Sequence, residues 1–195
     1  MKKILYSFLF SLAALSAFSQ SSLFSIKYSM GIGNNNLHKY IKTASFRGIA
    51  VDYRKIVKEK FGLGLDLGWN VFSEVKTFDT YIIHNTTYSG KQYRYSNHFP
   101  IMLATDLYLN QGKVFNPFFG IGIGTMHSVH NIDMNFYNFK IDAWQFALRP
   151  ELGFIFELDY GIGLLVCSKY YYGFGTKNMK GQAYCTFNIG IALQP

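Results

Sequence analysis

The chain has 195 residues, enough for one domain, and 49% of them are hydrophobic, 18% aromatic and only 15% charged. Soluble domains average roughly 25% charged residues, so this composition argues against an ordinary water-soluble domain. The formal net charge is +8, but the basic residues form no cluster, which argues against nucleic acid as a partner.

The first 19 residues have the pattern of a secretory signal peptide. Two lysines precede an apolar run from Ile4 to Ala17, which is shorter than the ~20 residues of a membrane-spanning helix. Small residues before Gln20 fit cleavage after Ser19. We therefore expect a signal peptide over residues 1–19 and one exported domain over residues 20–195. Without Lys2 and Lys3, 17 basic and 11 acidic residues remain, a net charge of +6.

Eight later segments alternate large apolar residues with small or polar ones. Alternation predicts extended strands, because successive side chains leave a strand on opposite faces. The segment from Phe61 to Trp69 shows it most clearly, since glycine or aspartate separates each pair of large residues. The predicted strands are Leu23–Ile32, Phe46–Lys55, Phe61–Trp69, His98–Leu109, Pro117–His127, Trp144–Glu157, Tyr160–Tyr172 and Tyr184–Leu193.

Glycine placement indicates which face of these strands meets lipid. Most strand glycines fall on the polar face, where a soluble, lipocalin-like barrel would meet water and gain nothing from them. Inside a narrow lumen the same glycines relieve crowding. The predicted fold is all-β, an eight-stranded antiparallel transmembrane up-and-down β-barrel. The residues expected to face lipid are Phe61, Leu63, Leu65, Leu67, Trp69, Phe119, Ile121, Ile123, Ile189 and Ile191.

The links between the predicted strands alternate between long and short. Long links contain the polar run Asn34–Asn36, the stretch Ser73–Asn97, the polar and aromatic loop Ser128–Ile141 and the loop around Thr176–Gly181. Tyrosines around Gly90 fit a hairpin rising above the membrane. Because the long links of outer-membrane barrels lie outside the cell, the short ones are expected in the periplasm.

Six of the charged side chains that parity points into the lumen are predicted to form one network. A charge in a narrow interior of low dielectric must be paired, so we expect an ion network around Arg149. Such a network would plug and stiffen the barrel; the alternative is a gated pore or a proton path. The predicted network residues are Asp52, Asp66, Asp106, Arg149, Glu151 and Lys169.

Three motifs carry a family resemblance: Phe61-Gly-Leu-Gly-Leu65, Phe119-Gly-Ile-Gly-Ile-Gly124 and Arg149-Pro-Glu-Leu-Gly153. With the signal peptide and eight strands, they resemble the small outer-membrane β-barrel family of OmpA/OmpW-like, porin-family domains, in their Bacteroidetes form. The resemblance covers the whole mature chain. It implies a protein of the outer membrane in contact with lipid and lipopolysaccharide, and inserted by the barrel-assembly machinery.

The sequence Arg94-Tyr-Ser-Asn-His98 resembles the His-x-Ser-Asn motif of the lipid A deacylase barrels. A hydrolase needs a serine, a histidine base and an acid that orients the base. Here Tyr95 replaces the expected histidine, and His98 follows Ser96, so a lipid A-modifying hydrolase is a minor alternative.

Three other groups of residues bear on possible sites. His127, His130 and Asp133 have a loose metal-ligand spacing, but a loop rarely fixes ligands. The two cysteines, Cys167 and Cys185, fall on opposite faces of neighbouring strands and are predicted to be free thiols. Aromatic residues in the predicted loops suggest ligand contact: Tyr81, Tyr88, Tyr93, Tyr95, Phe136 and Tyr137.

We therefore predict a monomeric, non-enzymatic outer-membrane barrel without metal or other cofactor. Its role would be to stabilise the envelope or to bind an extracellular ligand through its loops. The alternative in another class is an OmpW-like channel for small apolar solutes.

Overall fold

The computed structural model describes residues 22–58, 60–83, 86–134, 137–159 and 161–194. The predicted signal peptide lies outside these residues and stays a prediction. Within the described residues no helix has the length and apolarity needed to cross a membrane. The elements are β1 (Ser22–Asn34), α2 (Asn35–Tyr40), β2 (Gly48–Lys58), β3 (Phe61–Ile83), β4 (Thr86–Tyr108), β5 (Phe115–Met134), β6 (Tyr137–Asp159), β7 (Ile162–Gly173) and β8 (Gln182–Leu193).

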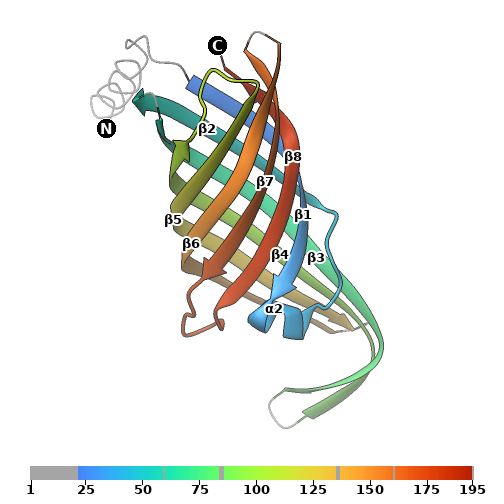
Figure 1. The fold of residues 1–195 in the computed structure, drawn as a ribbon. Helices are drawn as coiled ribbons and strands as arrows, with labels where there is room; N and C mark the ends of the chain where they lie inside the picture. The colour runs from blue at the N-terminus through green and yellow to red at the C-terminus, as the bar shows by residue number, and fades with distance from the viewer. Residues whose placement is uncertain (1–21, 59, 84–85, 135–136, 160, 195) are drawn as a thin grey trace, which may run out of the picture.

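The eight strands close into one antiparallel barrel in sequence order, with β1 paired to β8 (Figure 1). The β1–β8 register runs from Phe24 opposite Leu193 to Asn34 opposite Ala183. Closure leaves the barrel wall without an open edge, which a sheet in hydrocarbon requires. The predicted fold class is confirmed.

The outer surface of the wall is apolar, and the side chains predicted to face lipid lie there. Their exposed fractions range from 41% for Leu67 to 56% for Leu63. Leu63, Leu65 and Ile121, whose enclosure would have indicated a soluble carrier, all point outward. An exposed belt of this size would be insoluble in water and suits a bilayer.

Strand pairing continues through two stretches that the sequence predicts as long links, so the loop predicted over Ser128–Ile141 is wrong. β3 and β4 pair as far as Ile83 opposite Thr86, which confirms the hairpin that the tyrosines suggested. The polar segment Ser128–Ile141 likewise belongs to the β5–β6 hairpin. In both hairpins the backbone pairing between strands continues beyond the end of the apolar belt. The β3–β4 hairpin curves away beyond the rest of the barrel (Figure 1).

The segment after β1 is also more ordered than the predicted polar loop. Residues 35–40 form the short helix α2, and Leu37 and Ile41 are fully buried. Predicted strand two begins two residues later, at Gly48. There a Cβ atom would lie 2.6 Å from the Ser29 carbonyl, so only glycine fits this approach.

Candidate functional site

The middle of the lumen holds a layer of ions. All six residues predicted for the network lie there, with exposed fractions between 0% and 4%. Two further cations, Lys27 on β1 and Arg54 on β2, complete the layer and are 1% exposed. Parity already places both on the inner face, so the alternation of β1 and β2 could have added them to the predicted network.

The ion layer is connected by direct contacts between strands. Arg149 Nη2 lies 3.0 Å from Asp66 Oδ2, and its Nη1 contacts Glu151. Lys169 Nζ lies 3.0 Å from Asp52 Oδ1 and 2.5 Å from Asp66 Oδ2.

Further contacts join β2 to β4 across the lumen and to β1 beside it. Arg54 Nε donates to Asp106 Oδ2 at 2.5 Å, and Lys27 contacts Asp52. The layer therefore draws on β1, β2, β3, β4, β6 and β7. Four carboxylates face four cations, so the layer is neutral when all its members are ionised.

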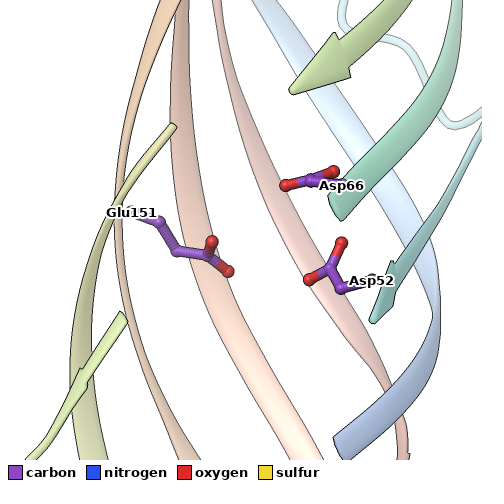
Figure 2. Close-up of side chains that lie close together, drawn as sticks. All are labelled: Asp52, Asp66 and Glu151. Atoms are coloured by element: carbon purple, nitrogen blue, oxygen red, sulfur yellow. The ribbon is translucent and has the colours of Figure 1, made fainter. Parts of the chain in front are cut away.

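Three of the carboxylates point toward a common centre (Figure 2). Oxygens of Asp52, Asp66 and Glu151 lie within 4.8 Å of one another, the spacing of a metal-binding cluster. In this protein, however, the Lys169 ammonium contacts two of them, and Arg149 contacts Asp66 and Glu151. Side-chain cations thus supply the positive charge that a metal would bring.

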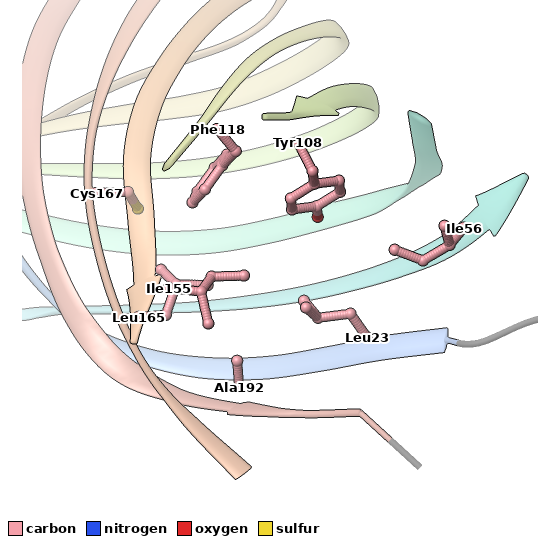
Figure 3. Packing of buried hydrophobic residues seen from close by; sticks show 8 residues of the cluster. All are labelled: Leu23, Ile56, Tyr108, Phe118, Ile155, Leu165, Cys167 and Ala192. Carbon is pink, nitrogen blue, oxygen red and sulfur yellow. The ribbon is translucent and has the colours of Figure 1, made fainter. Parts of the chain in front are cut away.

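Apolar side chains close the lumen on one side of the ion layer, toward the strand ends where β1 begins and β8 finishes. This end is called periplasmic and the other end extracellular, after the orientation expected from the lengths of the links. Tyr108 and Phe118 lie against each other, with ring centroids 5.6 Å apart. Aliphatic side chains from other strands meet them from across the barrel (Figure 3). This periplasmic layer consists of Leu23, Ile56, Tyr108, Phe118, Ile155, Leu165, Cys167 and Ala192.

A second apolar layer lies on the extracellular side of the ions. Phe72 and Tyr184 are fully buried there, with ring centroids 5.5 Å apart. Leu37 of α2 and Ile41 just after it belong to this layer, so the segment after β1 forms its outermost part, at the mouth of the barrel. This extracellular layer consists of Leu37, Ile41, Phe72, Met102, Met126, Ala147, Tyr171 and Tyr184.

The segment 35–47 crosses the mouth of the barrel. Tyr40 stacks on His130 of β5 at 4.5 Å, and its hydroxyl donates to the Asn131 carbonyl at 2.9 Å. Arg94 of β4 donates to the Tyr40 carbonyl. Asn36 donates to the Gly181 carbonyl at 2.8 Å. The segment is therefore fixed to strands on opposite sides of the mouth.

The serine–histidine motif of β4 forms a buried polar chain. Ser96 Oγ lies 2.8 Å from His98 Nε2, and His98 Nδ1 lies 2.9 Å from Ser128 Oγ. Ser128 in turn donates to Gln145 Oε1. A hydrolase would have a carboxylate in the place of Ser128, and Ser96 is fully buried. The geometry does not favour hydrolysis at this motif.

The loosely spaced metal ligands do not come together. His127 points outward, where it stacks on Trp144 and lies 3.4 Å from Asp142 Oδ2. His130 points inward and stacks on Tyr40. Strand parity separates them, so this metal-site hypothesis is wrong. Cys167 and Cys185 are free, as predicted.

Known structures share this architecture at low sequence identity. No protein-family model matches the chain, and no curated protein matches it either. OprG of Pseudomonas aeruginosa matches with a TM-score of 0.61 at 12% identity, covering 90% of this chain and 96% of that one.

Two other structures give similar values. Ail, the attachment invasion locus protein of Yersinia pestis, solved with the heparin analogue sucrose octasulfate, has a TM-score of 0.57 at 12% identity; 91% of this chain and 100% of that one are covered. Neisserial surface protein A has a TM-score of 0.55 at 9% identity, covering 89% and 96%.

The chain thus has the fold of the small eight-stranded outer-membrane barrels. Together with the exposed apolar belt, this fold places the protein in an outer membrane.

Proposed function

We propose that this protein is a sealed, non-enzymatic barrel that acts through its extracellular end, where it binds a polyanionic ligand. The filled lumen carries the proposal. A continuous aqueous bore would leave lumen side chains accessible, whereas those of the ion layer are at most 4% exposed. Conduction would require buried ion pairs to separate, at a cost of about 3–5 kcal/mol for each partner left unpaired.

The extracellular end has the shape and charge of a binding surface. The β3–β4 hairpin extends beyond the barrel, and Tyr93 and Tyr95 lie half-buried on its outer face. Because the ion layer is neutral, the excess positive charge lies outside the lumen. Basic side chains around this end, beyond the apolar belt, are Lys39, Lys42, Lys76, Lys91, Lys140, Lys177 and Lys180. Acidic residues whose side chains the structure describes at this end are Glu74, Asp133 and Asp142.

This excess favours sulfated or phosphorylated polymers over cationic or neutral ligands. Ail, which shares the fold, was solved with a heparin analogue, and this agrees with such a ligand. A polyanion would be attracted by several exposed lysines at once, and its affinity would fall with added salt.

Conductance in planar bilayers tests the sealed lumen. We expect no steady current from the wild-type protein at neutral pH. An Arg149→Ala variant that opens stable channels would show that the ion layer is the seal. A steady current through the wild-type protein would reject the proposal and favour the channel for small solutes.

Calorimetric titration with sucrose octasulfate tests the binding surface. The double variant Lys39→Gln/Lys42→Gln removes two exposed charges at the extracellular end, and we expect weaker binding and a shallower salt dependence. The matched control Lys60→Gln/Lys113→Gln removes two exposed charges at the opposite end and should bind as the wild type does. Equal losses in both variants would show that only net charge matters.

A further inference from the structure

The pairing of β1 with β2 changes at the extracellular side of the wall. The regular register ends at Tyr28 opposite Ile49. Only a bridge between Gly31 and Ser45 follows, in which each residue donates to the other at 2.7 Å. Residues 46–48 thus lie opposite residues 29–30, so the second segment bulges from the wall.

Two apolar grooves flank this bulge on the outer surface. The first, of about 310 Å³, lies toward β8. The second, of about 360 Å³, lies toward β3 and is lined by Arg47, Gly48, Ile49, Trp69 and Val71. Both volumes are in the range of ligand pockets. The first groove is lined by Met30, Gly31, Ile32, Ala44, Ser45, Phe46, Cys185 and Phe187.

One cation stands between the grooves. Arg47 is exposed on the bulge, and no ion pair joins it to another residue in the described part of the chain. Trp69, 53% exposed, lines the same groove, and tryptophan is typical of the membrane–water interface. A guanidinium at this depth is placed for a phosphate group of a lipid, which its planar donors can bind in pairs.

We propose that one phosphorylated lipid of the outer leaflet straddles the bulge, with its phosphate on Arg47 and acyl chains in the two grooves. The grooves continue the lipid-facing belt, so hydrocarbon is the occupant already in contact with them. A second copy of the chain would instead bring two copies of Arg47 toward the same interface. A soluble polyanion would not enter apolar grooves that lie against the membrane.

Native mass spectrometry of the folded protein in detergent tests this site, with diphosphorylated lipid A as the probe. We expect Arg47→Gln to lower the bound fraction about tenfold, as expected for the loss of one charge-assisted contact. Ala44→Trp keeps the charge but fills the first groove, and we expect it to lower binding as well. Lys113→Gln, which removes an exposed charge in the link between β4 and β5 at the opposite end of the barrel, is the matched control and should bind normally. A difference in gel mobility between unheated and heated samples, which a folded barrel shows, verifies that each variant is intact.

Two further probes separate the sources of binding. Lipid A without phosphates should bind weakly to the wild type, and excess inorganic phosphate should not displace the phosphorylated lipid. The proposal is overturned if Lys113→Gln loses as much binding as Arg47→Gln, if Ala44→Trp binds normally, or if inorganic phosphate displaces the lipid. None of these results depends on whether sucrose octasulfate binds, so the site can fail while the proposed function stands.

Discussion

The two faces of the barrel wall solve opposite problems with the same alternation. The outer face, represented by Leu65, is apolar and half-exposed to its surroundings, whereas the inner face holds Arg149 with no exposed surface. The inner face is itself divided, since its charges lie between two apolar layers. A soluble protein has the reverse arrangement, with its apolar side chains enclosed. Charged side chains can thus be buried in this barrel because they are paired, while its apolar outer surface is stable only in contact with a membrane.

Removing a charge from the ion layer of the inner face should lower the free energy of unfolding most. Arg149→Met leaves Glu151 without its closest partner, and we expect the free energy of unfolding to fall by about 3–5 kcal/mol. Urea unfolding in lipid vesicles measures it. Adding Glu151→Leu removes the orphaned carboxylate and should restore part of the loss, because Asp66 keeps Lys169. A loss below about 1 kcal/mol in the single variant would mean that water reaches the layer.

Placing a charge on the outer face tests whether the apolar belt is surrounded by a membrane. Leu65 lies at the centre of the apolar belt of β3, and Leu65→Arg should cost about 2–4 kcal/mol, as for arginine at a bilayer midplane. Val75→Arg, on the same face of β3 but in the projecting hairpin, should change stability by less than about 0.5 kcal/mol. The same vesicle unfolding assay serves. Equal effects at both positions would contradict a membrane around the belt.

The extracellular layer is expected to give a smaller, local effect. Leu37 is fully buried under the mouth, and Leu37→Ala should cost about 2–3 kcal/mol through the cavity it leaves. The loss should appear as faster hydrogen exchange in residues 35–47, because that layer holds α2 in place. His38→Ala, an exposed neighbour in α2, is the control and should exchange as the wild type does. Unchanged exchange in Leu37→Ala would show that the hydrogen bonds of Tyr40 and Asn36 suffice.

Local alternation allowed the strands and their faces to be predicted, because successive side chains of a strand point to opposite sides of the wall. Parity therefore found the inward position of Asp66 and Arg149 without knowledge of their partners. Which cation meets which carboxylate depends on shear around the whole barrel, and that is set by register between distant segments. Lys169 and Asp52, 117 residues apart in the chain, are one such pair.

The extracellular features were predicted less well for the same reason. The asparagines before Leu37 indicate a loop, and nothing local indicates that Leu37 and Ile41 turn back into the mouth. In the β3–β4 hairpin the alternation is broken by charged and polar residues, although backbone pairing continues. The bulge at residues 46–48 follows from how β1 and β2 part, which neither segment specifies alone.

The ion layer also bears on how the barrel is assembled. Its members come from six strands, and Lys27 belongs to the first of them while Lys169 belongs to the seventh. A sheet that closes with a shift of one residue would turn these groups toward hydrocarbon, and a shift of two would leave carboxylates opposite the wrong neighbours. Pairing of charges inside the lumen thus favours the native register at closure, because in that register each ion of the layer lies beside a counter-ion.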